Sequence, residues 1–136
     1  MFKELKPVIY VAGRYSDGGK LTKKACAINR QVLRDWSIKF VRGGWAVISP
    51  IENDEWMIGN WKTEAEYLDI IASDCALLER CDAIFLCPGW EGSRGAQMEF
   101  HFAQDNDITI FQLGTLVTAK EWLAQQASVV DMWRCA

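Results

Sequence analysis

The sequence predicts an α/β protein with a three-layer, doubly wound parallel sheet of four to five strands, flavodoxin-like in outline. Short continuous apolar runs recur along the chain, as expected for strands that are buried on both faces. Longer segments with apolar residues at helical spacing separate these runs, and a glycine-rich turn follows two of them. Strands and helices therefore alternate, which is the pattern of a parallel sheet covered by helices.

Composition limits the class of protein. The 136 residues, 50% of them hydrophobic, fit one domain spanning residues 1–136. A net charge of -3 lacks the basic surplus of a general nucleic-acid binder, so we expect a small-molecule partner and no nucleic-acid polymer. We find neither a signal-peptide pattern nor an apolar run of the ~20 residues that span a membrane, and expect a cytoplasmic protein without a membrane partner. The five cysteines are scattered without a C-x-x-C pair, which favours free thiols over disulfides or a metal site.

The first strand is predicted at Val8–Ala12, an apolar run that ends at Gly13. The loop that follows, GRYSDGG, is rich in glycine and can bring backbone N–H groups close to a ligand. Its spacing is neither that of a Walker loop nor that of a GxGxxG fingerprint, so it indicates a phosphate site only weakly.

A long amphipathic helix is predicted over about residues 21–40, because apolar residues recur there at helical spacing. These residues are Ala25, Ile28, Val32, Trp36 and Phe40. Two glycines, Gly43 and Gly44, end the helix, and Trp45–Ser49 is predicted as the second strand, closed by Pro50.

The segment Ile51–Lys62 has no clear period and is longer than most connections of its kind. It is predicted to be either a lid over the site or a contact with another subunit. Three of the seven tryptophans (Trp56, Trp61 and Trp90) fall in predicted loops. There they could stack on a planar ligand or seal a subunit interface.

The next helix is predicted to begin at Thr63, which with Glu66 forms a capping-box pattern. Its apolar stripe consists of Tyr67, Ile70, Ile71, Leu77 and Leu78. Asp74 falls inside this stripe. Because burial of an ionised carboxylate without partners is costly, Asp74 must have donors, serve a site, or lie where the helix opens onto a pocket. The alternative is an aspartate that reaches solvent at the edge of the stripe.

The central stretch runs from an apolar strand, Ala83–Cys87, through a glycine-rich loop into a helix, and then into a second apolar run, Ile108–Phe111. In a parallel sheet such a loop leaves the carboxyl end of a strand, where ligands bind, and the helix start offers free N–H groups to an anion. The helix carries Glu99 beside a small apolar face. The alternative is a solvent-exposed glutamate stabilised by the helix dipole.

A last helix is predicted at Thr118–Ala127. The terminal residues VVDMWRCA are either a fifth strand or a tail that docks on a neighbouring subunit.

Asp74 and Glu99 stand at the ends of different elements and could share one pocket, to which Tyr10 could add a phenol. Two carboxyl groups and a phenol suit attack at an anomeric carbon. The sole histidine, His101, follows Glu99 by two positions and would point to another helix face, which disfavours a hydrolase with a catalytic histidine.

The sequence resembles the nucleoside 2-deoxyribosyltransferase-like superfamily over residues 8–112, most closely its small, often phage-encoded branch. The matching segments are IYVAGRYS, VISP, the helix with Asp74, and CDAIFLCPGWEGSRGAQMEFHFA, and the most specific motif is Ser-x-Gly-x-x-x-Glu at Ser93, Gly95 and Glu99. The resemblance implies cleavage or exchange of the N-glycosidic bond of a 2′-deoxynucleoside or a nucleoside 5′-monophosphate. It also implies a homo-oligomer, and a reaction on side chains that needs neither metal nor cofactor.

By this resemblance Glu99 is the nucleophile that forms a covalent sugar intermediate, Tyr10 orients it, and Asp74 helps to protonate the leaving base. A serine at position 93, where transferases often have aspartate, favours a 5′-monophosphate, because a hydroxyl does not repel a phosphate dianion. The residues predicted to bind substrate are Gly13, Arg14, Ser16, Trp90, Ser93, Arg94 and Gly95.

Two other functions stay open. One is a nucleotide-binding or sequestering protein on the same scaffold that turns nothing over. The other is a flavin-binding protein, which is disfavoured because the first loop lacks a phosphate loop rich in serine and threonine.

Overall fold

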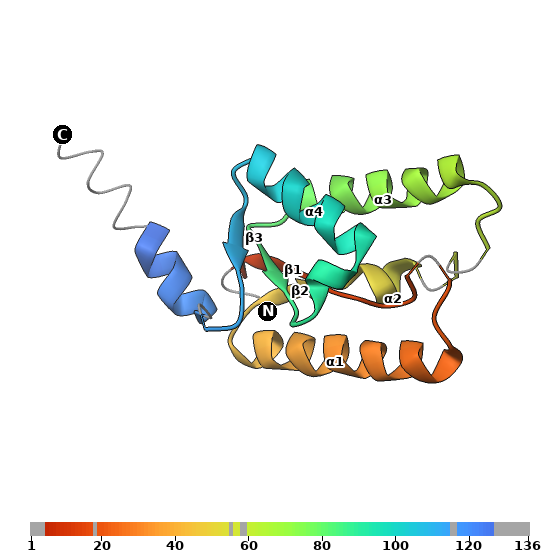
Figure 1. The fold of residues 1–136 in the computed structure, drawn as a ribbon. Coiled ribbons are helices and arrows are strands. Elements are labelled where there is room, and N and C mark those ends of the chain that lie inside the picture. Colours follow the sequence, from red (N-terminus) through yellow and green to blue (C-terminus); the bar gives the residue numbers. More distant parts are fainter. Residues whose placement is uncertain (1–4, 18, 55, 58–59, 115–116, 127–136) are drawn as a thin grey trace.

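The protein forms a four-stranded parallel sheet between two layers of helices, which confirms the predicted flavodoxin-like fold (Figure 1). The computed structural model describes residues 5–17, 19–54, 56–57, 60–114 and 117–126. The strands lie in the order β2-β1-β3-β4. The terminal residues 129–136, predicted to be a fifth strand or a docking tail, lie outside the described residues.

Strand β1 (Val8–Ala12) occupies the centre of the sheet, between β2 (Ala46–Ile48) and β3 (Ala83–Leu86), and β4 (Thr109–Phe111) pairs with the far side of β3. Residues 9–12 are completely buried, as their continuous apolar sequence predicts. Successive side chains of a strand point to opposite faces, so Tyr10 packs on the face opposite to that of its neighbours in the strand.

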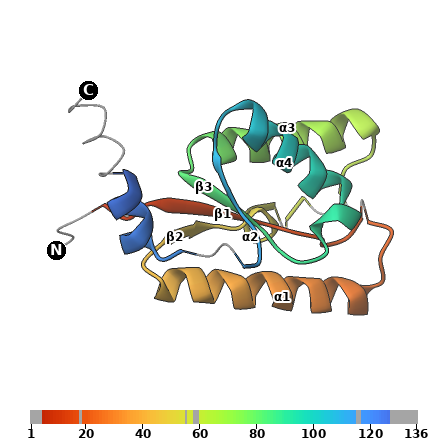
Figure 2. The ribbon, with the colours of Figure 1, turned by 60° about the vertical axis from the view of Figure 1, so that its left-hand side comes forward.

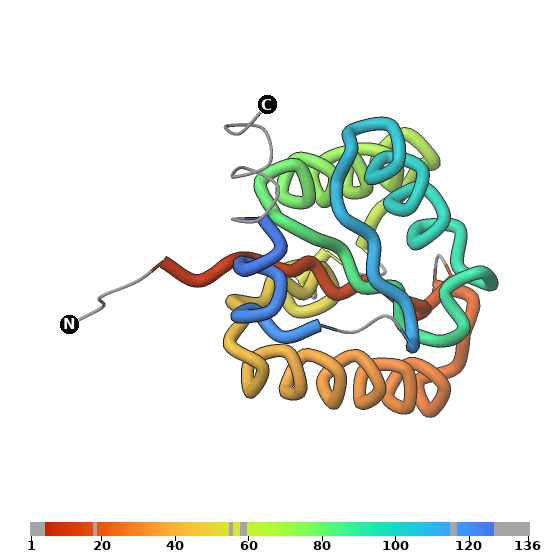
Figure 3. Tube along the Cα trace, turned by 90° about the vertical axis from the view of Figure 1, so that its left-hand side faces the viewer, coloured from red at the N-terminus to blue at the C-terminus, as the bar shows by residue number. Residues whose placement is uncertain are grey.

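Helix α1 (Lys23–Arg42) and the helical residues 119–126 cover one face of the sheet, and α3 (Glu64–Glu79) and α4 (Arg94–Asp105) cover the other (Figures 2 and 3). The C-terminal helical residues agree with the prediction. Among the described residues, no helix is both long enough and apolar enough to cross a membrane.

The predicted buried face of α1 was partly wrong. Ile28 and Val32 are exposed, whereas Leu33 and Phe40 are buried and Trp36 packs beside them. The buried stripe uses the spacing 33, 36 and 40, so it is rotated by about one residue from the stripe predicted along residues 25–32.

The segment after β2 also differs from the prediction. Pro50, expected to close the strand, instead opens a short helix, α2 (Pro50–Asp54), which agrees with the preference of proline for the first turn of a helix. Helix α3 begins as predicted, since the Thr63 side chain accepts a hydrogen bond from the Glu66 N–H at 3.1 Å. The Glu66 carboxylate accepts from the N–H of Lys62 at 2.7 Å, one residue earlier than in a capping box.

Gly13, at the end of β1, has no room for a side chain. A Cβ atom there would lie 2.9 Å from Leu33 Cδ2 and 3.0 Å from the Cβ atom of Cys87. We expect Gly13→Ala to lower the free energy of unfolding by about 1–3 kcal/mol through overpacking, measured by urea denaturation. The matched control is Gly92→Ala, whose added Cβ would come no closer than 4.0 Å to the flexible Arg14 side chain. Equal losses in the two variants would contradict this explanation.

Candidate active site

A cavity of about 390 Å³ opens at the carboxyl ends of the central strands. It is lined by the loop after β1, by α2, by one side of α3, and by the turn that leads from β3 into α4. This is where parallel α/β sheets bind ligands. Among the described residues its acidic and basic side chains are Asp17, Lys20, Asp54, Glu64, Asp74, Arg94 and Glu99.

Glu99 lies in the second turn of α4 with its carboxyl group at the bottom of this cavity. Only 5% of its surface is exposed, so the alternative of a solvent-exposed glutamate was wrong. The hydroxyl group of Tyr10 donates a hydrogen bond to Glu99 Oε2. Burial raises the pKa of Glu99 to about 7, although the bond from Tyr10 acts in the opposite direction.

Tyr10 lies beneath the cavity rather than on its wall, because its side chain is completely buried in the central strand. Burial, and then the negative charge of Glu99, raise the pKa of Tyr10 well above its ordinary value. The phenol therefore keeps its proton and serves as a permanent hydrogen-bond donor to the carboxylate.

Asp74, on α3, lines the same cavity and is 4% exposed, so it does not reach solvent at the edge of the helix. Burial is the main cause that raises the pKa of Asp74 to about 10, and a hydrogen bond with Asp54 and the charge of Glu99 add to it. The side chain is thus protonated at neutral pH. The carboxyl oxygen Oδ1 of Asp74 is buried and has no hydrogen-bond partner among the described residues.

Asp54, the last residue of α2, was not predicted as a site residue. The segment was identified as a lid or a subunit contact, but a helix of five residues shows no periodicity that would indicate which side chains face the cavity. Two aromatic residues also line the cavity, Trp61 and Tyr67, whose ring centroids are 5.3 Å apart. Trp61 was predicted only as one of three loop tryptophans.

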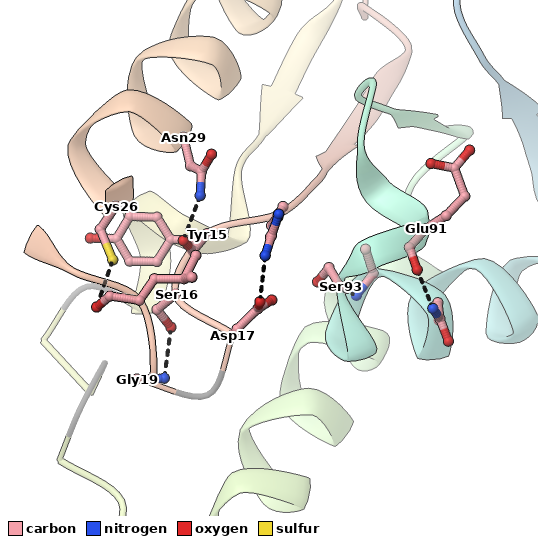
Figure 4. A network of polar contacts seen from close by, with 12 residues as sticks. Tyr15, Ser16, Asp17, Gly19, Cys26, Asn29, Glu91 and Ser93 are labelled. Atoms are coloured by element: carbon pink, nitrogen blue, oxygen red, sulfur yellow. Dashed lines mark hydrogen bonds and ion pairs between the residues drawn. The ribbon is translucent and has the colours of Figure 1, made fainter. Parts of the chain in front are cut away.

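The loop after β1 contributes Gly13 and Ser16 to the cavity wall. Ser16 is buried, and its Oγ accepts a hydrogen bond from the N–H of Gly19 at 3.2 Å (Figure 4). Arg14, predicted to bind substrate, does not line the cavity and forms an ion pair with Asp17 at 2.8 Å.

The N-terminus of α4 forms the facing wall. Ser93 caps the helix by accepting a hydrogen bond from the Ala96 N–H at 3.2 Å. Arg94 lines the cavity and pairs with Glu64. Gly95 leaves space for α3, since a Cβ atom there would lie 3.4 Å from the hydroxyl of Tyr67. The first turn of the helix directs its partial positive charge toward this part of the cavity.

Trp90, also predicted to bind substrate, is not brought to the cavity. Its ring packs on Phe100, with centroids 4.9 Å apart, and belongs to the core between the sheet and α4. His101 is exposed, as predicted for a residue on another helix face.

Cysteine and metal chemistry are not apparent in the part of the chain that the structure describes. Cys26, Cys75, Cys81 and Cys87 are free thiols, and Cys135 lies outside the described residues. No cluster of three or more histidine, cysteine, aspartate or glutamate side chains in that part is arranged to hold a metal ion.

Together, these features define a small flavodoxin-like α/β protein with two buried carboxyl groups and a buried tyrosine close to a cavity at the carboxyl edge of its sheet. Within that class, the chain belongs to the family described as Domain of unknown function (DUF4406), which matches residues 7–112. The matched range includes all four strands and the carboxyl groups of the cavity. A search of curated proteins finds no match.

Because the pKa of Glu99 is raised from 4.5 to about 7 in the folded protein, the unfolded chain loses this proton first as the pH rises. The folded protein therefore loses stability between about pH 4.5 and pH 7, and the full cost is present above pH 7. Glu99→Gln removes the buried charge and keeps an oxygen that can accept from Tyr10. We expect it to raise the free energy of unfolding at pH 8 by about 1–3 kcal/mol.

Urea denaturation at pH 5 and pH 8 tests this prediction, and the gain should be larger at pH 8. The control is Glu79→Gln, which removes the same charge from an exposed position on α3. A Glu99→Gln variant that is no more stable than wild type at pH 8 would contradict the raised pKa.

Proposed function

We propose that this protein cleaves or transfers the N-glycosidic bond of a 2′-deoxynucleoside or nucleoside 5′-monophosphate through a covalent ester between the sugar and Glu99. The observation that carries the proposal is the buried Glu99 carboxyl group, which opens onto the cavity and is held by the Tyr10 hydroxyl. A carboxylate fixed in this way is suited to act as a nucleophile at an anomeric carbon.

The two carboxyl groups have the opposite protonation states that the reaction needs. With a pKa of about 7, Glu99 is substantially ionised at neutral pH, whereas Asp74, with a pKa of about 10, holds a proton. Such separation of pKa values distinguishes the nucleophile from the acid.

In the first step a Glu99 oxygen attacks C1′, and the electrons of the C1′–N bond leave with the base, which takes the proton of Asp74. Tyr10 holds Oε2 of Glu99, which leaves Oε1 for the attack. In the second step water or another base attacks C1′ and releases Glu99 as a carboxylate. The incoming nucleophile returns its proton to Asp74, so both groups are restored.

The side chains that line the cavity favour a 5′-monophosphate over an unphosphorylated nucleoside as the substrate. Ser16 and Ser93 each accept a backbone N–H with the side-chain oxygen and keep a hydroxyl proton to donate to a phosphate oxygen. Both line the cavity, Ser93 as the N-cap of α4 and Ser16 from the loop after β1, and Lys20 adds a positive charge. The arginines contribute less, because Arg14 and Arg94 are already paired with Asp17 and Glu64.

We also propose that the protein is cytoplasmic and forms a homo-oligomer, as expected from the sequence. Helix α1 exposes Ile28, Val32, Ile38 and Val41, and an oligomer could bury this apolar surface.

Chromatography of the products tests the activity. Wild-type protein incubated with 2′-deoxynucleosides and their 5′-monophosphates, with and without an added acceptor base, should release free base. Glu99→Gln should lower the rate by about 10³-fold or more, because it removes the nucleophile. Glu79→Gln should leave the rate unchanged. Binding without base release from any substrate would favour the nucleotide-binding alternative, and full activity of Glu99→Gln would exclude the proposed intermediate.

The pH dependence of kcat/KM provides a separate prediction. The rate should rise as Glu99 ionises, with a midpoint near its pKa of about 7, and should fall as Asp74 loses its proton near its pKa of about 10. Initial rates between pH 5 and pH 11 should therefore describe a bell. Asp74→Asn should be slower and should lack the alkaline limb. A maximum at pH 5 would be incompatible with an ionised Glu99 as nucleophile.

A further inference from the structure

The loop between β1 and α1 is held in one shape by hydrogen bonds of its own backbone. The carbonyl oxygen of Ser16 accepts from the N–H groups of Gly19 at 3.1 Å and Leu21 at 3.0 Å. Within this turn Asp17 has a φ of 50°, in the left-handed region that aspartate enters more readily than most residues. The turn that carries Ser16 is therefore a defined structure.

Two consecutive residues of α1 hold Tyr15, the residue just before this turn. Asn29 Nδ2 donates a hydrogen bond to the carbonyl oxygen of Tyr15 at 2.8 Å (Figure 4), and Arg30 donates to the Tyr15 hydroxyl at 2.7 Å. The Arg30 guanidinium also lies 5.2 Å from the centre of the Tyr15 ring. Neither Asn29 nor Arg30 lines the cavity, so each can influence it only through the loop.

The bond from Asn29 sets the direction of the peptide group between Tyr15 and Ser16. In a planar trans peptide, the C=O of one residue and the N–H of the next point in opposite directions. No described peptide bond is cis. Because the Tyr15 carbonyl faces Asn29 on α1, the Ser16 N–H faces away from α1. The cavity is lined by this loop but by no residue of α1, so the N–H faces the cavity side.

Ser16 thus offers two adjacent donors to the cavity. Its N–H has no acceptor among the described residues, and its hydroxyl keeps a proton because the oxygen accepts from Gly19. An N–H beside an O–H suits an oxyanion. Ser93, the N-cap of α4, lines the same cavity. The inference below rests on the proposed function, in which these groups bind a 5′-phosphate.

We infer that Asn29 is a positioning residue for the phosphate group of the substrate. By holding the Tyr15 carbonyl, it keeps the Ser16 N–H turned toward the phosphate. Without this bond the peptide group can rotate, and the carbonyl oxygen can then face the anion in place of the N–H. Asn29 touches neither the substrate nor the reacting atoms. Its loss therefore weakens phosphate binding and leaves the chemistry at C1′ unchanged.

The test is Asn29→Leu, which keeps the branched shape of the side chain but removes the donor. Initial rates are measured with dAMP, dGMP, dCMP and dTMP and with the four corresponding 2′-deoxynucleosides. KM for the monophosphates should rise about tenfold or more, as expected for one hydrogen bond to a charged group, with kcat unchanged. KM for the nucleosides should stay at the wild-type value. Partial unfolding would instead lower kcat and leave KM unchanged.

A second variant and a control accompany this test. Asn29→Ala also removes the donor and should raise KM in the same way; Asn29 is only half-buried, so neither substitution empties the core. The control is Gln31→Ala, which removes an amide from an exposed position on the same helix, where it bonds Asp35 at 2.8 Å. It should keep the wild-type KM. An unchanged KM in both Asn29 variants, or an equal rise for nucleosides and monophosphates, would overturn the inference.

Calorimetric binding of the four monophosphates separates this inference from the proposed function. If wild type binds them but releases no base, the proposed function fails. A Kd that Asn29→Leu raises about tenfold would still support Asn29 as the positioning residue. Equal affinities in wild type and Asn29→Leu, or no binding of any monophosphate to wild type, would overturn the role of Asn29 itself.

Discussion

The hydrogen bond from Tyr10 to Glu99 joins the centre of the sheet to the helix that bears the buried carboxyl group of the cavity. Tyr10 has no freedom to move, because its strand is paired on both sides and its side chain is completely buried. Glu99 is equally restricted by α4, whose first turn is capped by Ser93. The bond therefore fixes the carboxyl group relative to the cavity before any ligand binds, which would reduce the ordering needed for the proposed reaction.

This arrangement lowers the stability of the folded protein. Glu99 and Asp74 are nearly inaccessible to solvent, and the structure tolerates them together because Asp74 keeps its proton while Tyr10 supports the negative charge of Glu99. A core of the same volume without these carboxyl groups would be more stable. Packing alone therefore does not account for these carboxyl groups, which supports the proposed chemistry in the cavity.

Much of this framework could be predicted from local sequence. The strands are apolar runs, and the carboxyl edge of a parallel sheet is fixed by topology, so Asp74 and Glu99 could be expected at one cavity. The prediction failed at positions where tertiary contacts determine which side chains are buried. Ile28 and Val32 have helical spacing but face solvent because the buried stripe of α1 is rotated. Trp90 was predicted in a loop but begins a short 3-10 helix and packs on Phe100. Asp54 could not be predicted because only the fold brings α2 to the same cavity as Asp74.

The contrast between Asp54 and Glu99 follows from the elements that hold them. Glu99 belongs to a helix of 12 residues packed on the sheet, and its position is tied to the core by Tyr10. Asp54 ends a helix of five residues that is anchored by the buried Pro50. A substitution in α2 can therefore alter the oxygens that line this side of the cavity without removing the Tyr10–Glu99 bond. Burial is the main cause of the raised pKa of Glu99, but the charge of Asp54 nevertheless contributes to it, so the two parts of the fold remain coupled through electrostatics.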